Sequence, residues 1–517
     1  MAIDRRTALG LAGAATLAPA AAHAATGFEG QRRADLGDGT FRNPIVSGDR
    51  PDPTIVRDGD SWWMTFSSFD AYPGLLLWRS NDLVNWTPTT AALHTPVGSV
   101  WAPELTRHEG RWFLYFHART ATRRDLFVIH ADRPEGPWSE PVTLGLPKHI
   151  DPGHAVGEDG HRYLFLSGGD RVRLRADGLA VDGPVEHVYD PWRYPDDWVV
   201  ESFSPEGPKI LRHGDWFHMI TAVGGTAGPP TGHMVIAARS PSIHGPWEHC
   251  PHNPLVRTRS RHEPWWSRGH ATLVEGPGGR WWMVQHGYEK DYWTLGRQCL
   301  LEPIAWTDDD WWRPLGGTLA QPLPMPTSSR QAAHGMPLSD DFATDRLGVQ
   351  WSFYDPQPNE TARLRRTGRT LHLAAKGSTP ADASPLTFIA GDRRYSLEVD
   401  VEIDAGTTAG LLLFYNRRLY CGLGFNGEGL VLHRYGLERP ARRESQPRRL
   451  VMRLTNDEQT VSLHYSPDGK AWTRHDVRME VSGYHHNTAG DFLSLRPALY
   501  AAGAGEARFR NLRYRAF

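Results

Sequence analysis

The chain has 517 residues, and its 57 Lys and Arg against 59 Asp and Glu give a formal net charge of −2. This balance excludes a generally basic nucleic-acid binder and a strongly acidic solvating segment. With 39 % hydrophobic and 22 % charged residues, the composition is that of a folded globular protein, which excludes a largely disordered chain.

Residues 1–26 have the pattern of a bacterial export signal. A basic start with Arg5 and Arg6 precedes an apolar run over residues 8–22, and the Ala-His-Ala sequence of residues 22–24 is typical of a cleavage site. The paired arginines favour the twin-arginine type. The apolar run is too short to span a bilayer core of about 30 Å. We therefore expect a secreted or periplasmic protein whose mature form has no membrane association.

The cysteines are Cys250, Cys299 and Cys421. They are too few and too widely spaced to predict a disulfide framework or a zinc site. We expect each of them to be a small buried hydrophobic side chain.

A unit of about fifty residues recurs five times in the first two thirds of the chain. Each copy has a Gly turn followed by an aromatic-rich run typical of a strand, and the glycines are Gly59, Gly110, Gly160, Gly214 and Gly279. A second motif follows in most copies, so each unit holds about four strands. A fixed period of this length indicates a solenoid, propeller or array, and the missing 3.6-residue periodicity excludes a helical solenoid. We predict an all-β fold that begins with a five-bladed β-propeller over residues 41–315.

The pattern changes after the fifth unit. Residues 316–338 are rich in Pro, Ser, Thr and Gly, which predicts a linker or strap. Farther on, residues 395–403 and 460–465 alternate apolar and polar side chains, as expected of an antiparallel sandwich. We therefore predict a second domain, a jelly-roll-like β-sandwich, over residues 339–517.

In each propeller unit a polar residue opens the strand that leads into the Gly turn. These residues are Asp52, Glu104, Asp151, Glu206 and His270. Equivalent positions of the innermost strands surround the central channel of a propeller, so we expect four carboxylic acids and a histidine to converge at its mouth. Grouped like charges are costly unless a task or a counter-ion offsets them.

Three tasks suit such a cluster of acids: binding a hard cation, hydrolysing a glycosidic bond, or stabilising the ends of the sheets. Glycoside hydrolysis needs one protonated acid near the leaving oxygen and one carboxylate that either activates a water molecule or attacks the anomeric carbon. A third carboxylate can orient the acid and raise its pKa. The residues alone leave these alternatives open.

Motifs around these positions resemble glycoside hydrolase family 43. They follow the family order over residues 41–315 and are Asn43-Pro44-Ile45, Arg50-Pro51-Asp52-Pro53, Val100-Trp101-Ala102-Pro103-Glu104, His149-Ile150-Asp151-Pro152, Pro205-Glu206-Gly207-Pro208, Arg268-Gly269-His270 and Leu295-Gly296-Arg297. The resemblance implies a five-bladed propeller of inverting glycosidases, mostly β-xylosidases, α-L-arabinofuranosidases, arabinanases and galactanases. The C-terminal domain is similar to the concanavalin-like sandwich of the β-xylosidase branches. One departure is Gly153, which stands where the family often has Ser.

The resemblance implies a role for three of the acids. Asp52 matches the general base that activates water, Glu206 matches the general acid, and Asp151 matches the residue that orients the acid and tunes its pKa. Glu201 is a rival acid, but we favour Glu206 because it lies in Glu-Gly-Pro and at the repeat-equivalent position. Inversion requires base and acid carboxyls about 6.5–9.5 Å apart. Glu104 has no clear counterpart, and its role stays open.

The resemblance also implies a sugar pocket. Phe69 and Trp101 resemble its aromatic walls, although each could instead pack in the propeller core. Arg297 resembles an arginine that binds sugar hydroxyls in exo-acting members. His270 resembles a histidine that either faces the sugar or lies beside a calcium ion near the channel. Calcium prefers oxygen ligands, so calcium is a possibility only, and we predict no metal ligand and no required cofactor.

The leading hypothesis is an exported exo-glycosidase that releases xylose from plant cell-wall oligosaccharides. The alternatives are an α-L-arabinofuranosidase or galactan-active enzyme of the same family, a carbohydrate-binding propeller without turnover, and a scaffold for protein partners. The expected partner is an oligosaccharide, with no oligomeric state assigned. Nucleic acid is disfavoured, because 25 Lys and Arg against 21 Asp and Glu in residues 339–517 are too evenly dispersed for a phosphate track.

Overall fold

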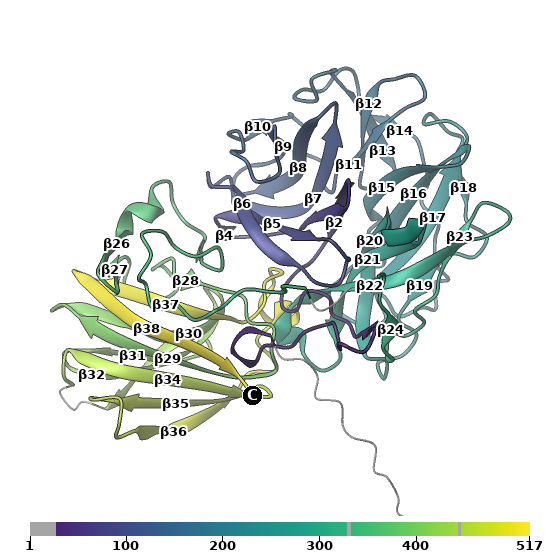
Figure 1. Cartoon of the computed structure of the whole chain (residues 1–517). Coiled ribbons are helices and arrows are strands. Elements are labelled where there is room, and N and C mark those ends of the chain that lie inside the picture. The colour runs from purple at the N-terminus through teal and green to yellow at the C-terminus, as the bar shows by residue number, and fades with distance from the viewer. Residues whose placement is uncertain (1–26, 328–331, 443–445) are drawn as a thin grey trace, which may run out of the picture.

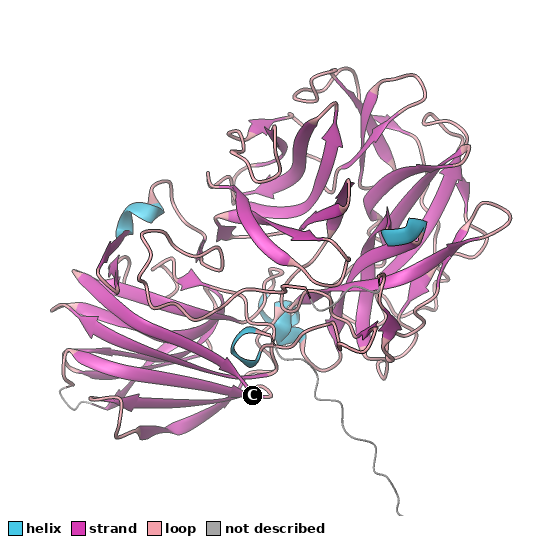
Figure 2. Ribbon diagram, in the orientation of Figure 1, coloured by secondary structure: helices cyan, strands magenta, loops and turns pink. Residues whose placement is uncertain are grey.

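The computed structural model describes residues 27–327, 332–442 and 446–517. Strands form almost all of its regular structure, and in this part of the chain the helices are α1 (His486–Ala489) and the short turns η1 (Phe28–Gly30), η2 (Pro277–Gly279), η3 (Trp293–Leu295) and η4 (Glu360–Arg363) (Figure 2). The predicted export signal, residues 1–26, lies outside the described residues. Among those described, no helix has the length and apolarity needed to cross a membrane.

Five antiparallel sheets, counted over the described ranges, confirm the predicted propeller (Figure 1). In chain order the blades are β2 (Thr54–Asp58), β3 (Ser61–Thr65), β5 (Gly74–Ser80), β6 (Thr87–Leu93); β7 (Ser99–His108), β8 (Arg111–Arg119), β9 (Arg124–Ala131), β10 (Val142–Thr143); β11 (Gly153–Val156), β12 (Arg162–Leu166), β13 (Asp170–Leu174), β14 (Glu186–His187); β15 (Glu206–His213), β16 (Trp216–Val223), β17 (Met234–Ser240), β18 (Glu248–His249), with β19 (Val256–Arg257) beside β17; and β20 (Trp265–Glu275), β21 (Trp281–Glu289), β22 (Arg297–Trp306), β23 (Trp312–Pro314).

The repeated glycines lie in the turn between the first and second strand of each blade. Gly59, for example, separates β2 from β3 with a φ of 60°, and Gly110 separates β7 from β8 with a φ of 83°. Only glycine adopts this left-handed backbone without strain, which explains why the turn is the most regular feature of the repeat.

The segment before the first blade contacts blade five and the segment that follows it. The Ile45 N–H donates to the Cys299 carbonyl (2.9 Å), and β1 (Thr40–Phe41) pairs with β24 (Leu323–Pro324). The segment predicted as a linker thus contains a short strand, and its Met325 and Leu338 are buried. In the described parts of this segment, residues 316–327 and 332–338, these side chains pack into the same hydrophobic cluster as Phe41 and Phe342.

The C-terminal domain is the predicted β-sandwich, drawn in green and yellow in Figure 1. As described, one sheet has the order β33 (Leu437–Arg442), β32 (Gly429–Arg434), β31 (Leu419–Asn426), β30 (Thr407–Asn416), β37 (Arg496–Gly503), β28 (Leu386–Thr387), β25 (Ser352–Tyr354), β4 (Ala71–Tyr72). The other has β26 (Leu364–Thr367), β27 (Thr370–Ala374), β38 (Glu506–Ala516), β29 (Arg394–Ile403), β34 (Arg449–Asp457), β35 (Thr460–Ser466), β36 (Thr473–Glu480).

The two domains share structure. Strand β4 belongs to blade one in sequence, yet it pairs with β25 at the edge of the sandwich sheet. A continuous hydrophobic cluster also joins the domains and includes Phe69 and Val284 of the propeller with Trp351 and Phe388 of the sandwich. Burial of such apolar surface is the dominant stabilising term in folding, so the sandwich is fixed against blades one and five.

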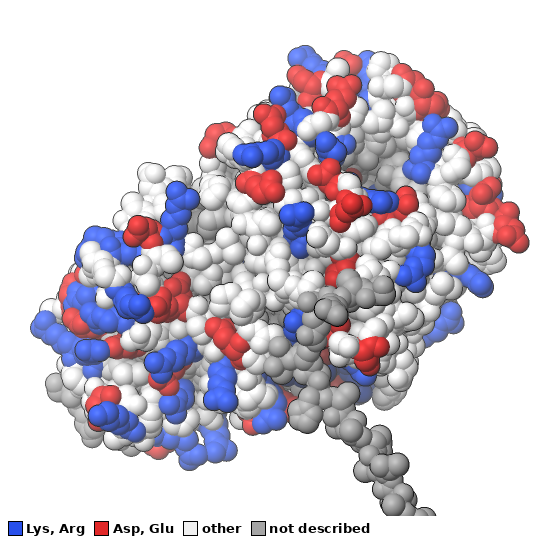
Figure 3. Space-filling view, in the orientation of Figure 1, with Lys and Arg blue, Asp and Glu red and all other residues white. Residues whose placement is uncertain are grey.

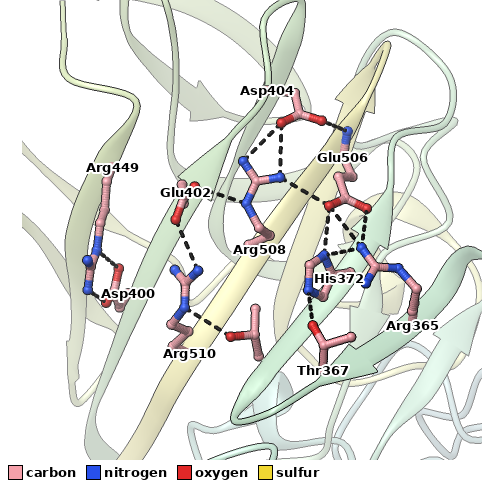
Figure 4. Close-up of polar contacts among 11 residues, drawn as sticks. Arg365, Thr367, His372, Asp400, Glu402, Asp404, Arg449, Glu506, Arg508 and Arg510 are labelled. Carbon is pink, nitrogen blue, oxygen red and sulfur yellow. Dashed lines mark hydrogen bonds and ion pairs between the residues drawn. The ribbon is translucent and has the colours of Figure 1, made fainter.

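The outer face of the sheet containing β38 carries a network of ion pairs (Figure 4). Arg508 contacts Glu402 and Glu506 (both 3.0 Å) and Asp404 (2.9 Å), and Arg510 contacts Glu402 (3.0 Å). Ion pairs at the protein surface contribute about 1 kcal/mol or less each, and these side chains are half-buried there. The basic side chains of this network therefore have carboxylate partners, and both signs of charge lie on the face of the sandwich that Figure 3 shows.

The three cysteines Cys250, Cys299 and Cys421 are buried and free, as expected.

Candidate active site

The chain bends at the same place in every blade where it enters the channel. Asp52, Ala102, Asp151 and Ser204 each precede a proline and have positive φ values of 56°, 33°, 54° and 26°, and His270 of blade five has a φ of 49°. A residue before proline normally adopts an extended conformation, so this backbone is strained. All five residues line one cavity of about 140 Å³. Strained backbone concentrated around one cavity is typical of a functional site.

Asp52 is held as an ionised carboxylate. Arg297 Nη1 donates to its Oδ1 (2.8 Å), and the Ser67 hydroxyl donates to its Oδ2 (2.5 Å). Burial by itself raises the pKa of Asp52, but Arg297 and then His270 outweigh it and hold this pKa well below its usual range. Asp52 therefore has the chemistry of a base.

The surroundings of Glu206 shift its pKa in the opposite direction from that of Asp52. Burial raises the pKa of its carboxyl, the nearby charges of Asp151 and Asp52 add to that rise, and the imidazole of His270 only partly opposes it. Its Oε1 lies 3.6 Å from His270 Nε2 and 3.9 Å from His233 Nδ1. Two carboxylic acids whose environments drive their pKa values apart indicate a base and an acid.

His270 stands between the acids. Its Nδ1 is 3.8 Å from Asp52 Oδ1, while its Nε2 is 3.4 Å from Asp151 Oδ2 and 3.6 Å from Glu206 Oε1. Burial disfavours the imidazolium, but Asp52, Asp151 and Glu206 together raise the pKa of His270 to about 10. The ring therefore carries a positive charge at neutral pH and keeps the Asp52 and Glu206 carboxyls from meeting directly.

Asp151 is tied to the element that carries Glu206. Its Oδ2 accepts a hydrogen bond from the N–H of Gly207, the residue after Glu206 (3.2 Å). Blades three and four approach so closely here that a Cβ at Gly153 would lie 1.8 Å from the Pro208 carbonyl oxygen. Any side chain at position 153 would therefore clash with the backbone of blade four.

The aromatic wall of the cavity comes from both domains. Phe69 and Trp101 of the propeller pack against Phe492 of the sandwich, with ring centroids 6.1 Å and 5.6 Å from it. The Arg297 guanidinium lies 5.6 Å from the Phe69 centroid and 5.3 Å from that of Phe492. Sequence reasoning missed Phe492, because it lies in a loop outside the repeat and no motif marks it.

The structure corrects the expectation for Glu104, which does not line the cavity. The strand β7 has a register shift between Trp101 and Glu104, and Ala102 is the residue of this blade that lines the cavity. Glu104 is buried and pairs with Lys209 Nζ (2.5 Å), while its other oxygen accepts from the His154 N–H (3.2 Å). It therefore ties neighbouring blades together.

Glu201, the rival acid, also lines the cavity but is exposed at its rim. Its Oε2 accepts a hydrogen bond from the Ala227 N–H (2.7 Å). The Glu206 side chain is only 19 % exposed, and burial raises its pKa, which favours Glu206 over the exposed Glu201 as the acid.

Glu206, His233 and His270 place ligand atoms within 4.8 Å of one another, the geometry of a small metal site. Two nitrogens and one carboxylate do not fit calcium, which takes six to eight oxygen ligands. We derive no role for a metal from these residues.

The charge on His270 makes a prediction for stability. Its pKa is 6.5 in the unfolded chain and about 10 in the folded protein, so its stabilisation is complete below pH 6.5 and is lost as pH rises through about 10. The Tm advantage of the wild type over His270→Gln should therefore shrink across that range. His161→Gln makes the same substitution at an exposed site and is the control. A His270→Gln difference that stays constant or grows with pH would contradict the assigned charge.

Two family models together match most of the chain. Residues 41–312 match the model for glycosyl hydrolases family 43, and residues 339–515 match that for the beta xylosidase C-terminal concanavalin A-like domain. The chain is similar to the non-reducing end alpha-L-arabinofuranosidase BoGH43B of Bacteroides ovatus, at 32 % identity over 336 residues, 62 % of this chain and 62 % of that protein. The match thus covers less than two thirds of that relative's length.

Two further similarities cover more of the other protein. A xylan 1,3-beta-xylosidase of a Vibrio species is 30 % identical over 381 residues, 65 % of this chain and 69 % of that protein. Among solved structures, the crystal structure of the GH43 BlXynB protein from Bacillus licheniformis superposes with a TM-score of 0.83 at 25 % identity, over 92 % of this chain and 100 % of that chain.

Proposed function

This chain belongs to glycosyl hydrolase family 43, and from that premise we propose that it is an inverting exo-β-D-xylosidase acting on plant cell-wall oligosaccharides. The observation that carries the proposal is the opposite displacement of two pKa values in one cavity. Arg297 holds the pKa of Asp52 well below its usual range, and burial raises the pKa of Glu206.

The reaction follows from these two charge states. Glu206 protonates the glycosidic oxygen as the bond to the leaving group breaks. Asp52 removes a proton from a water that attacks the anomeric carbon from the opposite face, so the configuration inverts. Inversion needs the carboxyls about 6.5–9.5 Å apart, and the His270 ring lying between them supports such a separation. Asp151 acts through the Gly207 N–H, which fixes the backbone beside the acid.

The shape of the cavity supports release of a terminal sugar. Its volume is small, and Phe492 of the sandwich closes one side of it. Arg297 has a second role in this cavity, because its guanidinium can donate to sugar hydroxyls while it neutralises Asp52.

An α-L-arabinofuranosidase of the same mechanism is the second candidate, favoured by the similarity to the Bacteroides ovatus arabinofuranosidase. The test is kcat/KM on aryl β-D-xylopyranoside against aryl α-L-arabinofuranoside. We expect faster turnover of the xyloside. Faster turnover of the arabinofuranoside would replace the first candidate with the second. A folded protein that turns over neither would contradict both and favour another glycoside, such as a galactan, or a binding propeller.

The role of Phe492 can be measured with Phe492→Ala. Losing the ring opens the wall beside Phe69 and Trp101, so we expect KM to rise and kcat/KM to fall about tenfold, equivalent to about 1.4 kcal/mol. Phe517→Ala, which removes an exposed ring of the same domain, should leave both constants unchanged. An unchanged KM in Phe492→Ala would remove Phe492 from the substrate site.

Export through a twin-arginine pathway is supported by the sequence of residues 1–26. Replacing both arginines, Arg5→Lys with Arg6→Lys, should retain the enzyme in the cytoplasm of a bacterial host. Unchanged activity outside the cytoplasm would contradict this route.

A further inference from the structure

One segment of the sandwich, residues 491–496, contacts the two propeller segments that carry Asp52 and its ion-pair partner Arg297. Phe492 lies in the cavity wall, and the Leu495 N–H donates to the Thr294 carbonyl (2.9 Å), three residues before Arg297. Arg496, the first residue of β37, donates from Nη2 to Asp49 Oδ2 (2.9 Å). The sandwich is therefore bonded to both segments that carry the Arg297–Asp52 pair.

Asp49 and Arg496 form a buried ion pair between the domains. Their side chains are 1 % and 6 % exposed, so the charges are almost fully removed from water. A buried ion pair is strongly destabilised when one partner is removed, because the remaining charge is left without compensation. Asp49 lies only three residues before Asp52 in the chain.

Asp49 also lies next to the other partner of Asp52. A Cβ on Gly296, which precedes Arg297, would be 2.4 Å from Asp49 Oδ1, and the Arg50 N–H donates to the Arg297 carbonyl (2.6 Å). Among the described residues, Oδ1 of Asp49 accepts no hydrogen bond. Asp49 and Asp52 therefore both lie within the electrostatic influence of one guanidinium, that of Arg297.

We propose that Arg496 is a positioning residue that holds Asp49 away from Arg297, so that Arg297 stays bound to Asp52. The sandwich thereby sets the charge state of the general base, an inference that rests on the proposed function. Without Arg496, Asp49 has two cations left within reach. Arg50 already donates to the Asp49 carbonyl (2.9 Å) and stacks over Trp78, which leaves Arg297 as the new partner.

The charged and titratable groups around Asp49 and Asp52 determine how the pKa of Asp52 should change when Arg496 is replaced. Asp52 faces Arg297 from β22, His286 from β21, His270 from β20, and the acids Asp151 and Glu206. Asp49 faces Arg496, Arg297 and Arg50, with Tyr288 and Tyr415 nearby. His286 stays neutral because burial lowers its pKa to about 3, so it cannot replace the charge of Arg297.

The experiment is the pH profile of kcat/KM for Arg496→Met. The acidic limb of this profile reports the base of the free enzyme. When Asp49 draws Arg297 away, the pKa of Asp52 rises, and the limb should move to higher pH by about one unit. In the double variant Asp49→Asn/Arg496→Met the competing charge is gone, so the limb should return to its wild-type position. A purely structural role would give no such restoration.

Arg393→Met is the matched control. It also breaks an interdomain ion pair, Arg393 with Glu289 (2.5 Å), but away from Asp52, and it should leave the limb unchanged. An unmoved limb in Arg496→Met, or a moved limb that the double variant fails to restore, would overturn the proposal. If Arg496→Met does not fold, the single variant Asp49→Asn tests the proposal. An acidic limb that moves to higher pH in Asp49→Asn would contradict a competition between Asp49 and Asp52 for Arg297.

A crystal structure of Arg496→Met provides a readout that needs no turnover. The proposal requires the Asp49 carboxylate to turn toward the Arg297 guanidinium, and an unmoved Asp49 would overturn it. Failure of the proposed function gives a different result, since wild-type protein would then turn over neither aryl glycoside while Asp49 still moves.

Discussion

Replacing Asp52 with Asn should reduce the turnover of every glycoside substrate by about 10⁴-fold, the upper range for loss of general base catalysis. The amide keeps the shape of the side chain, and its oxygen can still accept from Arg297, while its NH2 group would face the Ser67 hydroxyl as a donor. It cannot take a proton from the attacking water. Because water attack is needed whatever the leaving group, natural oligosaccharides and activated aryl glycosides should lose activity alike.

Asp125→Asn is the matched control for this variant. Asp125 is a buried aspartate of blade two that accepts from the Leu146 N–H (2.6 Å), outside the cavity. Its replacement should leave kcat unchanged even if it lowers Tm. Turnover by Asp52→Asn near the wild-type level, in a protein of unchanged fold, would remove the assigned base.

Replacing Glu206 with Gln should separate substrates by their leaving groups. We expect kcat on xylo-oligosaccharides to fall by about 10³-fold, because the departing sugar oxygen needs the proton. An aryl glycoside with a strongly activated leaving group needs little protonation and should lose far less. The measurement is the ratio of the two kcat losses in one variant.

Glu201→Gln is the control for the acid, because Glu201 lines the same cavity at its exposed rim. It should change kcat for both substrates only slightly and to the same degree. If the dependence on the leaving group appeared in Glu201→Gln instead of Glu206→Gln, the acid would have been assigned to the wrong residue.

The sequence predicted the propeller because its signal is local and repeated. A turn that requires a positive φ favours glycine, and Gly59 and Gly110 mark it in successive blades. The prediction that one polar residue of each blade lines the channel was less reliable, because the residues were matched by their polar side chains and not by the conformation of the backbone. Glu104 shows the error, because the register shift in β7 places Ala102 in the cavity instead.

Contacts between the domains could not be predicted from local patterns. Arg496 and Asp49 are 447 residues apart, and neither lies in a motif. Phe492 likewise reaches the cavity only because β4 and the shared hydrophobic cluster dock the sandwich on blade one. Sequence patterns report local preference, whereas these contacts depend on how two finished domains pack.

The distinction between base and acid also came from the fold. Asp52 and Glu206 are both carboxylic acids, and the sequence assigned their roles only through resemblance to a family. Their environments separate them physically, because Arg297 stabilises the ionised form of Asp52 and burial disfavours that of Glu206.

The central claim, a single displacement between Asp52 and Glu206, is tested most directly by the configuration of the first product. Proton NMR of the wild-type enzyme with an aryl β-D-xylopyranoside should show α-xylose at the earliest times, before the anomers equilibrate. If β-xylose appears first, the enzyme retains configuration. Asp52 would then act as a nucleophile rather than as the base of a water molecule, and the single-displacement mechanism would be wrong.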